Sequence, residues 1–374
     1  MPTPLDDYRK AAQDKFGTLS KHIPHFVYWR LGNSLDTMID YFANIERSTA
    51  DDVAGTVITQ GTNALKDTSG IWFDDFGWWT ISTTRAAQQT FFSDTVRKQF
   101  ADLSSQCWKL FHERAPYTWE RHNPETYKDY GPAVGGGVWN EYWTGTPPIW
   151  TGPKDGDPTV GNLHGIQNTV TNAVYLISAQ RRSEPAAKLA YEFFNDWLFL
   201  QAQPALWWRQ DKGALIRERV SRFANVDPAP GFQDDWAWTG DLALVMGIFL
   251  NRIALGIDRE VAVKLVTDFL EGARLSLIDS KGLLQPWTAS GQVPAANVNE
   301  WADTPDYLTG TGVFWRYLLQ AWKLNNSDLR KLIGSTDYKA FIRNNADVAL
   351  KQETDLDKLS NQIAVLVAAT VVLA

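Results

Sequence analysis

Two kinds of apolar segment alternate along this chain of 374 residues, and their alternation is the strongest constraint on its fold. Residues 236–253 are apolar nearly all round, and residues 163–179 are apolar with a few uncharged polar residues, which is typical of helices buried on every side. Residues 187–197 and 262–270 instead repeat apolar side chains at i, i+3 and i+4, which predicts helices with one face in water. Since no convincing run of alternating strand residues is present, we expect an all-α fold with at most short β pieces in loops.

The two kinds of helix follow each other in pairs, and the pairs recur at a period longer than that of the common solenoid repeats. The expected pairs are 75–91 with 94–113, 163–181 with 184–201, 236–254 with 258–276, and 311–323 with 327–348. A closed toroid of helical hairpins requires this alternation, because its inner helices are buried on every side and its outer helices have one wet face. We therefore expect a single domain over residues 1–374.

Three long connecting segments, 114–162, 203–235 and 277–310, are rich in Gly, Pro, Trp, Asp and Asn. Loops of this length in a compact domain usually carry function. Because they alternate with the helical hairpins, they should gather at one end of a barrel. The functional site is expected at that end, above the inner helices.

Charge and composition argue against several classes of function. Lys and Arg number 36 against 43 Asp and Glu, which disfavours a basic nucleic-acid-binding protein. The single cysteine, Cys107, cannot form an intramolecular disulfide or a cysteine metal cluster. The apolar run 363–374 is shorter than the about 20 residues of a bilayer span, and the N-terminus lacks a signal-peptide pattern. We expect no metal, no cofactor, no nucleic acid and no membrane span, and the compartment stays open.

The sharpest candidate for chemistry is the aspartate pair Asp74 and Asp75, within the sequence IWFDDFGWW at 71–79. Two adjacent carboxylates raise the pKa of one of them, and apolar walls raise it further, so one would hold a proton while the other stays ionised. Glycoside hydrolysis needs this division between an acid and a nucleophile or base. Adjacent positions favour the carboxyl separation of about 5–5.5 Å found in retaining enzymes. The structural alternative is a capped helix N-terminus, where Asp is favoured.

Several uncharged or aromatic positions are candidates for ligand binding. The chain has 18 tryptophans, more than a core needs, and flat indoles are suited to sugar rings or another hydrophobic ligand. Glycines permit close backbone approach, and buried amides bind either ligand hydroxyls or neighbouring loops. The candidate substrate-binding residues are Trp78, Gly136, Gly137, Trp139, Asn168, Asn172, Trp236, Trp238 and Asp241. For each of them a purely structural role is the alternative.

These motifs resemble glycoside hydrolase family 76, the endo-α-1,6-mannanases, and occur in the family's order. DDFGWW at 74–79 looks like the family signature, GGGVW at 135–139 resembles its glycine loop, and QNTVTN at 167–172 resembles its K-N-A-(I/V)-T-N helix. The segments 307–318 and 360–364 resemble two later pieces of the family.

The resemblance implies an (α/α)6 barrel and retaining double-displacement chemistry on α-linked mannan-type glycans. By the family's motif, Asp74 would be the nucleophile and Asp75 the acid/base. The stretch 236–241 reads WAWTGD where the family reads W-T-Y-N-Q-G, and Gln167 stands in place of a lysine. Another α-linked glycan, or glycan transfer in place of hydrolysis, therefore stays open.

Three other classes of protein share some of these sequence features. A metal-dependent terpene-type cyclase would need a second magnesium motif, which the sequence lacks, although acid-catalysed cyclisation of a small molecule in the same cavity stays open. A sugar epimerase would favour paired histidines, and the chain has only five histidines in all. A non-catalytic glycan-binding barrel would keep the tryptophans without needing the two acids.

Overall fold

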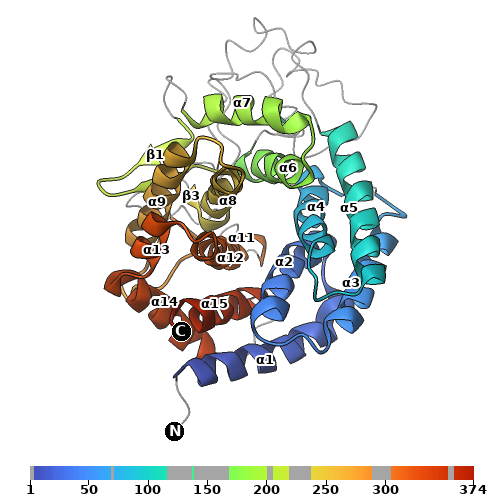
Figure 1. The fold of residues 1–374 in the computed structure, drawn as a ribbon, viewed down its shortest axis with the longest axis horizontal. Helices are drawn as coiled ribbons and strands as arrows, with labels where there is room; N and C mark the ends of the chain where they lie inside the picture. The colour runs from blue at the N-terminus through green and yellow to red at the C-terminus, as the bar shows by residue number, and fades with distance from the viewer. Residues whose placement is uncertain are drawn as a thin grey trace, which may run out of the picture.

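The computed structural model describes residues 4–68, 71–115, 137–138, 168–199, 205–218, 237–288, 305–352 and 358–374. Within these ranges helices form two concentric rings (Figure 1). The inner ring consists of α2 (Tyr28–Asn44), α4 (Phe73–Ala87), α6 (Thr169–Arg182), α8 (Thr239–Leu255), α12 (Gly310–Lys323) and α15 (Leu359–Val372). Each of these helices contacts the next one along the chain, and α15 contacts α2, so the ring closes.

The outer ring consists of α1 (Pro4–His22), α3 (Ala50–Ala64), α5 (Asp94–Arg114), α7 (Ala186–Leu198), α9 (Arg259–Ser276) and α14 (Thr336–Lys351). Each outer helix packs on an inner one, as α5 does on α4 and α9 on α8. The N-terminal α1 packs on the C-terminal α15, which completes the toroid. Short helices η1 (Ile23–His25), α11 (Pro305–Leu308) and α13 (Ser327–Ile333) join these elements. The protein is therefore an all-α (α/α)6 barrel, as predicted.

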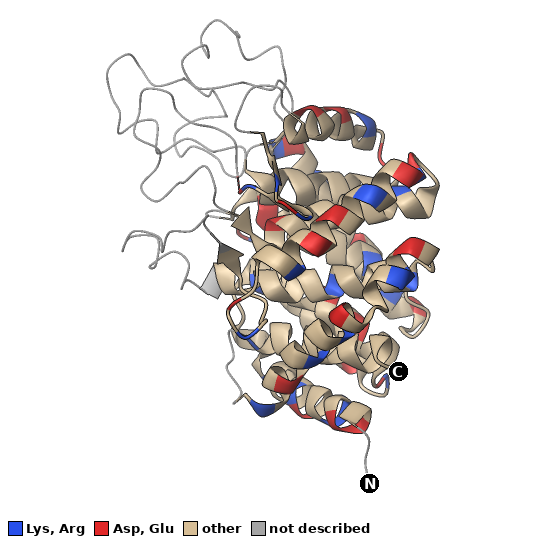
Figure 2. Ribbon diagram, turned by 90° about the vertical axis from the view of Figure 1, so that its left-hand side faces the viewer, with Lys and Arg blue, Asp and Glu red and all other residues tan. Residues whose placement is uncertain are grey.

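Three of the inner and outer pairs coincide with the pairs predicted from the sequence, with shifts of a few residues at their ends. In the fourth, the predicted outer helix 327–348 is instead two helices, α13 and α14, separated at Gly334 and Ser335. The sequence pattern did not predict α2, although most of that helix is buried. The reason is chemical, because buried polar residues such as Asn33, Asp36 and Asp40 interrupt its apolar pattern. In Figure 2 the outer helices α1 and α7 carry charges of both signs, as expected for helices with one face in water.

The inner helices run parallel, so they all begin at one end of the barrel. Gly77 and Val174, near the starts of α4 and α6, touch so closely that a Cβ on Gly77 would lie 2.5 Å from Val174 Cγ2. At the other end, Arg85 in the last turn of α4 binds Asp40, toward the end of α2, at 2.5 Å between Nη2 and Oδ1. When neighbouring helices touch start to start or end to end, they must run in the same direction. The first turns of all the inner helices therefore surround one end, which we call the N-terminal end of the ring.

Two short antiparallel ribbons accompany the helices. Strands β1 (Trp207–Arg209) and β2 (Ala214–Ile216) form a hairpin in which Trp207 pairs with Ile216. Strand β3 (Ala237–Trp238) pairs with β4 (Trp287–Thr288) immediately before α8 begins. Thr239 fixes this junction, because its N–H donates to Pro286 O at 2.7 Å and its hydroxyl to Gln285 O at 2.5 Å. None of the described helices is long and apolar enough to cross a membrane.

A cluster of buried charges lies toward the opposite, C-terminal end of the inner ring. Asp36 and Asp40 of α2 are each 2% exposed. Arg85 bridges them, with 2.9 Å from Nη1 to Asp36 Oδ1. Arg181 and Arg316 approach the Asp36 carboxylate from α6 and α12, at 3.9 and 3.7 Å. We call these five residues the charge cluster.

Candidate functional site

The aspartate pair lies in the first turn of α4, at the N-terminal end of the ring. The N-cap residue is Trp72, whose backbone is extended and whose side chain makes no capping hydrogen bond. Asp74 and Asp75 follow at the second and third helical positions. The alternative in which one of them is the N-cap residue is therefore wrong. Both carboxylates still lie where the positive end of the helix dipole favours negative charge.

The side chains around the pair differ sharply in burial. Phe73 and Phe76 are 1% and 0% exposed and anchor the first turn in the core. Asp74 and Asp75 are half-buried, so the two acids form the accessible side of this turn. Trp72 is 47% exposed, which is unusual for an indole and provides an open aromatic surface one residue before the helix. Trp72 was not among the binding residues predicted from the sequence, although it belongs to the same IWFDDFGWW motif.

Tyr28, at the start of α2, faces the pair from the neighbouring inner helix. Its ring stacks on Trp79 with 5.2 Å between centroids and meets the edge of Phe76 at 6.3 Å. Burial raises the pKa of Tyr28 well above its ordinary value, and the adjacent Cys107 and the negative charge of Asp75 raise it further. Tyr28 is therefore a neutral phenol near Asp75 and adds no second negative charge to the site.

Cys107 does not qualify as a nucleophile for this site. The thiol is completely buried, and burial raises its pKa to about 12. The reactive form of cysteine is the thiolate, which is scarce at neutral pH when the pKa is that high. The two aspartates thus remain the candidates for nucleophilic chemistry at this end of the ring.

The start of α6 carries two of the predicted amides, and both bind protein atoms. Asn168 is the N-cap residue, and its Oδ1 accepts the Thr171 N–H at 3.1 Å. The Asn172 amide accepts the Val138 N–H at 2.9 Å and donates to Val138 O at 3.2 Å. Gly137 has a φ of +79°, and a Cβ there would lie 2.7 Å from Asn172 Oδ1. Asn172 therefore positions the described end of the glycine segment against α6, and Asn168 caps that helix.

The start of α8 carries Trp238 and Asp241, which are 6% and 0% exposed. The Trp238 indole N–H donates to Tyr307 O at 2.7 Å. The same ring fills space left by Gly240 and Gly310, where an added Cβ would lie 2.4 and 2.5 Å from it. Trp238 thus joins α8 to the segment before α12, and its face is not open to a ligand.

The remaining candidates divide between the core and the undescribed parts of the chain. Trp78 is 2% exposed, and its ring lies 6.2 Å from that of Trp29. Gly136, Trp139 and Trp236 lie outside the described residues. In the described ranges no group of three or more His, Cys, Asp or Glu side chains could hold a metal ion. The structure thus gathers Asp74, Asp75, Asn168, Asn172, Trp238 and Asp241 at one end of the ring, with the two acids of α4 accessible.

Comparison with known proteins places the fold. No family model matches the sequence, and no curated protein matches it. Solved structures match over almost the whole chain. The GH76A alpha-1,6-mannanase from Salegentibacter sp. HEL1_6 is 15% identical, with a TM-score of 0.58, covering 98% of this chain and 99% of that one. An inactive variant of that enzyme in complex with alpha-1,6-mannotetrose gives a TM-score of 0.61 at 14% identity and the same coverage.

A further match is the Lin0763 protein from Listeria innocua, at 13% identity and a TM-score of 0.57. The alignment covers 93% of this chain and 86% of that one. At these identities the likeness is one of fold. The resemblance to family 76 is confirmed at that level, and the barrel is shared with glycosidases.

Proposed function

We propose that the protein is a retaining glycosidase or transglycosidase that acts on α-linked mannan-type glycans, with Asp74 as nucleophile and Asp75 as acid/base. The observation that carries the proposal is the place of the pair. Two half-buried carboxylates open an inner helix at one end of the barrel, on a buried aromatic base. Such a site combines acids that a ligand can reach with walls that exclude water from one side.

The proposed chemistry has two steps. In the first, the ionised Asp74 carboxylate attacks the anomeric carbon while Asp75 gives its proton to the departing glycosidic oxygen. This yields a glycosyl ester of Asp74 and a released alcohol. In the second, Asp75 takes a proton from water or from a sugar hydroxyl, whose oxygen then displaces Asp74. Two inversions at the anomeric carbon leave the product with the α configuration of the substrate.

The structure of the described site supports separate roles for its other residues. The positive end of the α4 dipole stabilises the ionised carboxylate that acts as nucleophile. The exposed face of Trp72 is proposed to stack on a sugar ring beside the cleaved bond. Asn168 and Asn172 are proposed to act indirectly, by holding the segment at Gly137 in place. Trp238 and Asp241 are both buried and are proposed to act indirectly, by fixing the start of α8.

The substrate class rests on the solved neighbours. Inactive variants of the Salegentibacter mannanase are in complex with alpha-1,6-mannotriose and alpha-1,6-mannotetrose. We propose the same class of glycan for this chain, because its acid pair occupies an inner-helix start in the same fold. Residues 237–241 of the altered stretch lie at the start of α8, so we propose that a difference in the glycan bound would be read on the α8 side of the site.

The test is product analysis on α-1,6-linked mannan oligosaccharides, comparing wild type with Asp74→Asn and Asp75→Asn. Wild type should release products that are α anomers at the earliest times, observed by proton NMR. Each Asn variant should lose turnover by about 10³-fold or more, because a neutral amide can neither attack nor transfer the proton. First products with the β configuration would exclude the retaining mechanism. If folded wild type does not cleave these oligosaccharides, the mannan assignment fails.

A further inference from the structure

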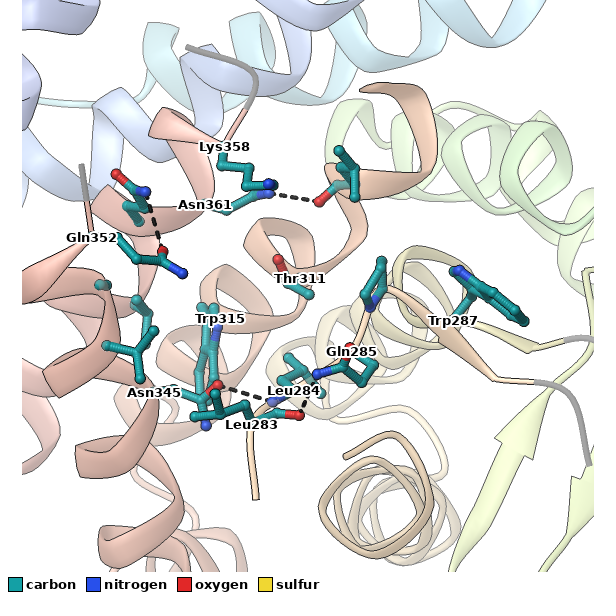
Figure 3. A pocket seen from close by; sticks show the side chains of 16 residues that line it. Leu283, Leu284, Gln285, Trp287, Thr311, Trp315, Asn345, Gln352, Lys358 and Asn361 are labelled. Atoms are coloured by element: carbon teal, nitrogen blue, oxygen red, sulfur yellow. Dashed lines mark hydrogen bonds between the residues drawn. The ribbon is translucent and has the colours of Figure 1, made fainter. Parts of the chain in front are cut away.

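A hollow lies beside α12 and α15 (Figure 3). It is a cavity of about 500 Å³ between α12, α15, the end of α14 and the segment 283–287. α4 contacts α2 and α6 in the ring, whereas α12 contacts α8 and α15, so α12 lies on the opposite side. The volume falls within the range of about 300–1,000 Å³ that is typical of small-molecule sites. We call this hollow the lateral pocket.

The walls of the lateral pocket combine indole rings with neutral polar groups. Two indoles line the pocket, Trp287 of β4, which is half-buried, and Trp315 of α12, which is 2% exposed. Side-chain amides line it from several elements, and no Asp or Glu is found among its described lining residues. One cation, Lys358, lies at its edge. Flat apolar surface next to uncharged donors and acceptors suits a sugar ring better than a cation or an apolar ligand.

Part of this amide lining is fixed by hydrogen bonds to the protein. The Asn361 amide donates to Leu308 O at 2.6 Å and accepts the Gly312 N–H at 3.1 Å. Asn345 accepts the Leu284 N–H at 2.9 Å through its Oδ1. These bonds tie α15 to the start of α12 and α14 to the segment 283–287. The pocket is therefore held in shape before any ligand binds, which reduces the entropic cost of binding.

Two other polar groups have unused hydrogen-bonding capacity. In Figure 3 the half-buried Thr311 side chain lies at the middle of the pocket, and its hydroxyl makes no hydrogen bond to any described residue. Gln352 accepts from Gln362 Nε2 at 3.2 Å through Oε1, while its own NH₂ group has no partner in the described part of the chain. A hydroxyl and an amide donor across one cavity can bind neighbouring hydroxyls of a sugar.

We propose that the lateral pocket is a second carbohydrate site, which binds one neutral hexose residue at a distance from the cleaved bond. The pocket lies at the N-terminal end of the ring, because Thr311 and Asn361 belong to the first turns of α12 and α15. A glycan chain bound at the acid pair and a residue bound in the pocket therefore share one end of the barrel. The choice of ligand, a mannan-type oligosaccharide, rests on the proposed function.

The test separates the two sites with their own tryptophans. Protein labelled with ¹⁵N in its tryptophans, carrying Asp74→Asn and Asp75→Asn to stop turnover, is titrated with α-1,6-mannotetraose. The indole signal of Trp72 reports on the acid pair and that of Trp287 on the pocket. We expect the Trp287 signal to shift on titration. Thr311→Val combined with Gln352→Leu should weaken that response by about tenfold, because two hydrogen bonds are lost, and leave the Trp72 response unchanged.

Thr336→Val, on the exposed start of α14, is the matched control and should change neither response. Thermal unfolding of each variant confirms that it is folded. A Trp287 signal that does not shift, or a shift that the pocket variant leaves intact, overturns the inference. Cleavage by wild type without a response at Trp287 refutes the pocket alone. A pocket response without cleavage by wild type supports the pocket and refutes the proposed hydrolysis.

Discussion

Two pairs of aspartates lie toward opposite ends of the inner ring, and the surroundings of the two pairs differ. Toward the C-terminal end, Asp36 and Asp40 are almost completely buried and are bound by Arg85. At the N-terminal end, Asp74 and Asp75 are half-buried in a helix first turn between aromatic residues. The first arrangement joins helices, and the second leaves carboxylates within reach of a ligand. The comparison separates structural acids from candidate catalytic ones without reference to any relative.

Electrostatics at the charge cluster support its structural role. Burial alone would raise the pKa of Asp36. The pKa is instead lowered, because Arg85, Arg181 and Arg316 lie around the carboxylate. An acid that stays ionised in this way is a poor proton donor near neutral pH. The role of Asp36 is structural, because its carboxylate joins α2 to the arginines of α4, α6 and α12.

The largest expected effect distinguishes the two ends by activity. Asp75→Asn should lower kcat by about 10³-fold or more, because no other group replaces its proton, and should leave the melting temperature close to that of wild type. Asp40→Asn should instead lower stability while the folded fraction keeps its kcat. Turnover at saturating mannan oligosaccharide and thermal unfolding measure the two effects. Equal loss of activity in both variants would remove the distinction between the ends.

The second prediction concerns the free energy of unfolding. Arg85→Met should lower it by about 3–5 kcal/mol, since Asp36 and Asp40 would lose the arginine that bridges them. Arg97→Met is the control, because its partner Asp94 is exposed on α5 and surface pairs contribute little. Urea unfolding measures both variants. A loss below about 1 kcal/mol for Arg85→Met would mean that the cluster does not hold the ring together.

The sequence predicted the helical architecture well because burial leaves a local pattern. The two mostly apolar segments correspond to α6 and α8, and the segments with one apolar face correspond to α7 and α9. Periodicity alone could not predict closure of the ring, which the resemblance to family 76 implied, since closure depends on α15 meeting α2 from the other end of the chain. The charge cluster was equally invisible, because Asp36, Arg85 and Arg316 are far apart in the sequence and meet only in the folded ring.

For the candidate site, the sequence predicted where the acids lie better than it predicted which aromatic side chains are exposed. It placed Asp74 and Asp75 at the start of an inner helix, which is where they lie. It also offered Trp78 and Trp238 for substrate binding, but both rings are packed between helices. Helical periodicity does not distinguish an indole that faces a cavity from one that fills it. The open indole, Trp72, precedes the helix and so falls outside any periodic pattern.

The third prediction uses pH to separate the charge cluster from the site. Because the pKa of Asp36 is lowered on folding, its contribution to stability is present above the unfolded pKa of about 3.9 and is lost as pH falls through the folded value. Asp36→Asn should therefore flatten the acid dependence of the free energy of unfolding, by up to about 1.4 kcal/mol per pH unit below pH 4. Urea unfolding at several acidic pH values measures this slope. Identical slopes in wild type and variant would contradict the role of the arginines.

The smallest effect sharpens the description of the N-terminal end. Trp72→Ala should raise KM for mannan oligosaccharides by about fivefold, equivalent to ~1 kcal/mol of stacking, with kcat little changed. Since Trp72 is 47% exposed, its loss should barely alter thermal stability. Trp72→Phe keeps an aromatic face and should recover most of the affinity. Trp78→Phe, in the core, is the control and should lower the melting temperature without raising KM. If Trp78→Phe raises KM and Trp72→Ala does not, the buried indole and not the exposed one contacts the sugar.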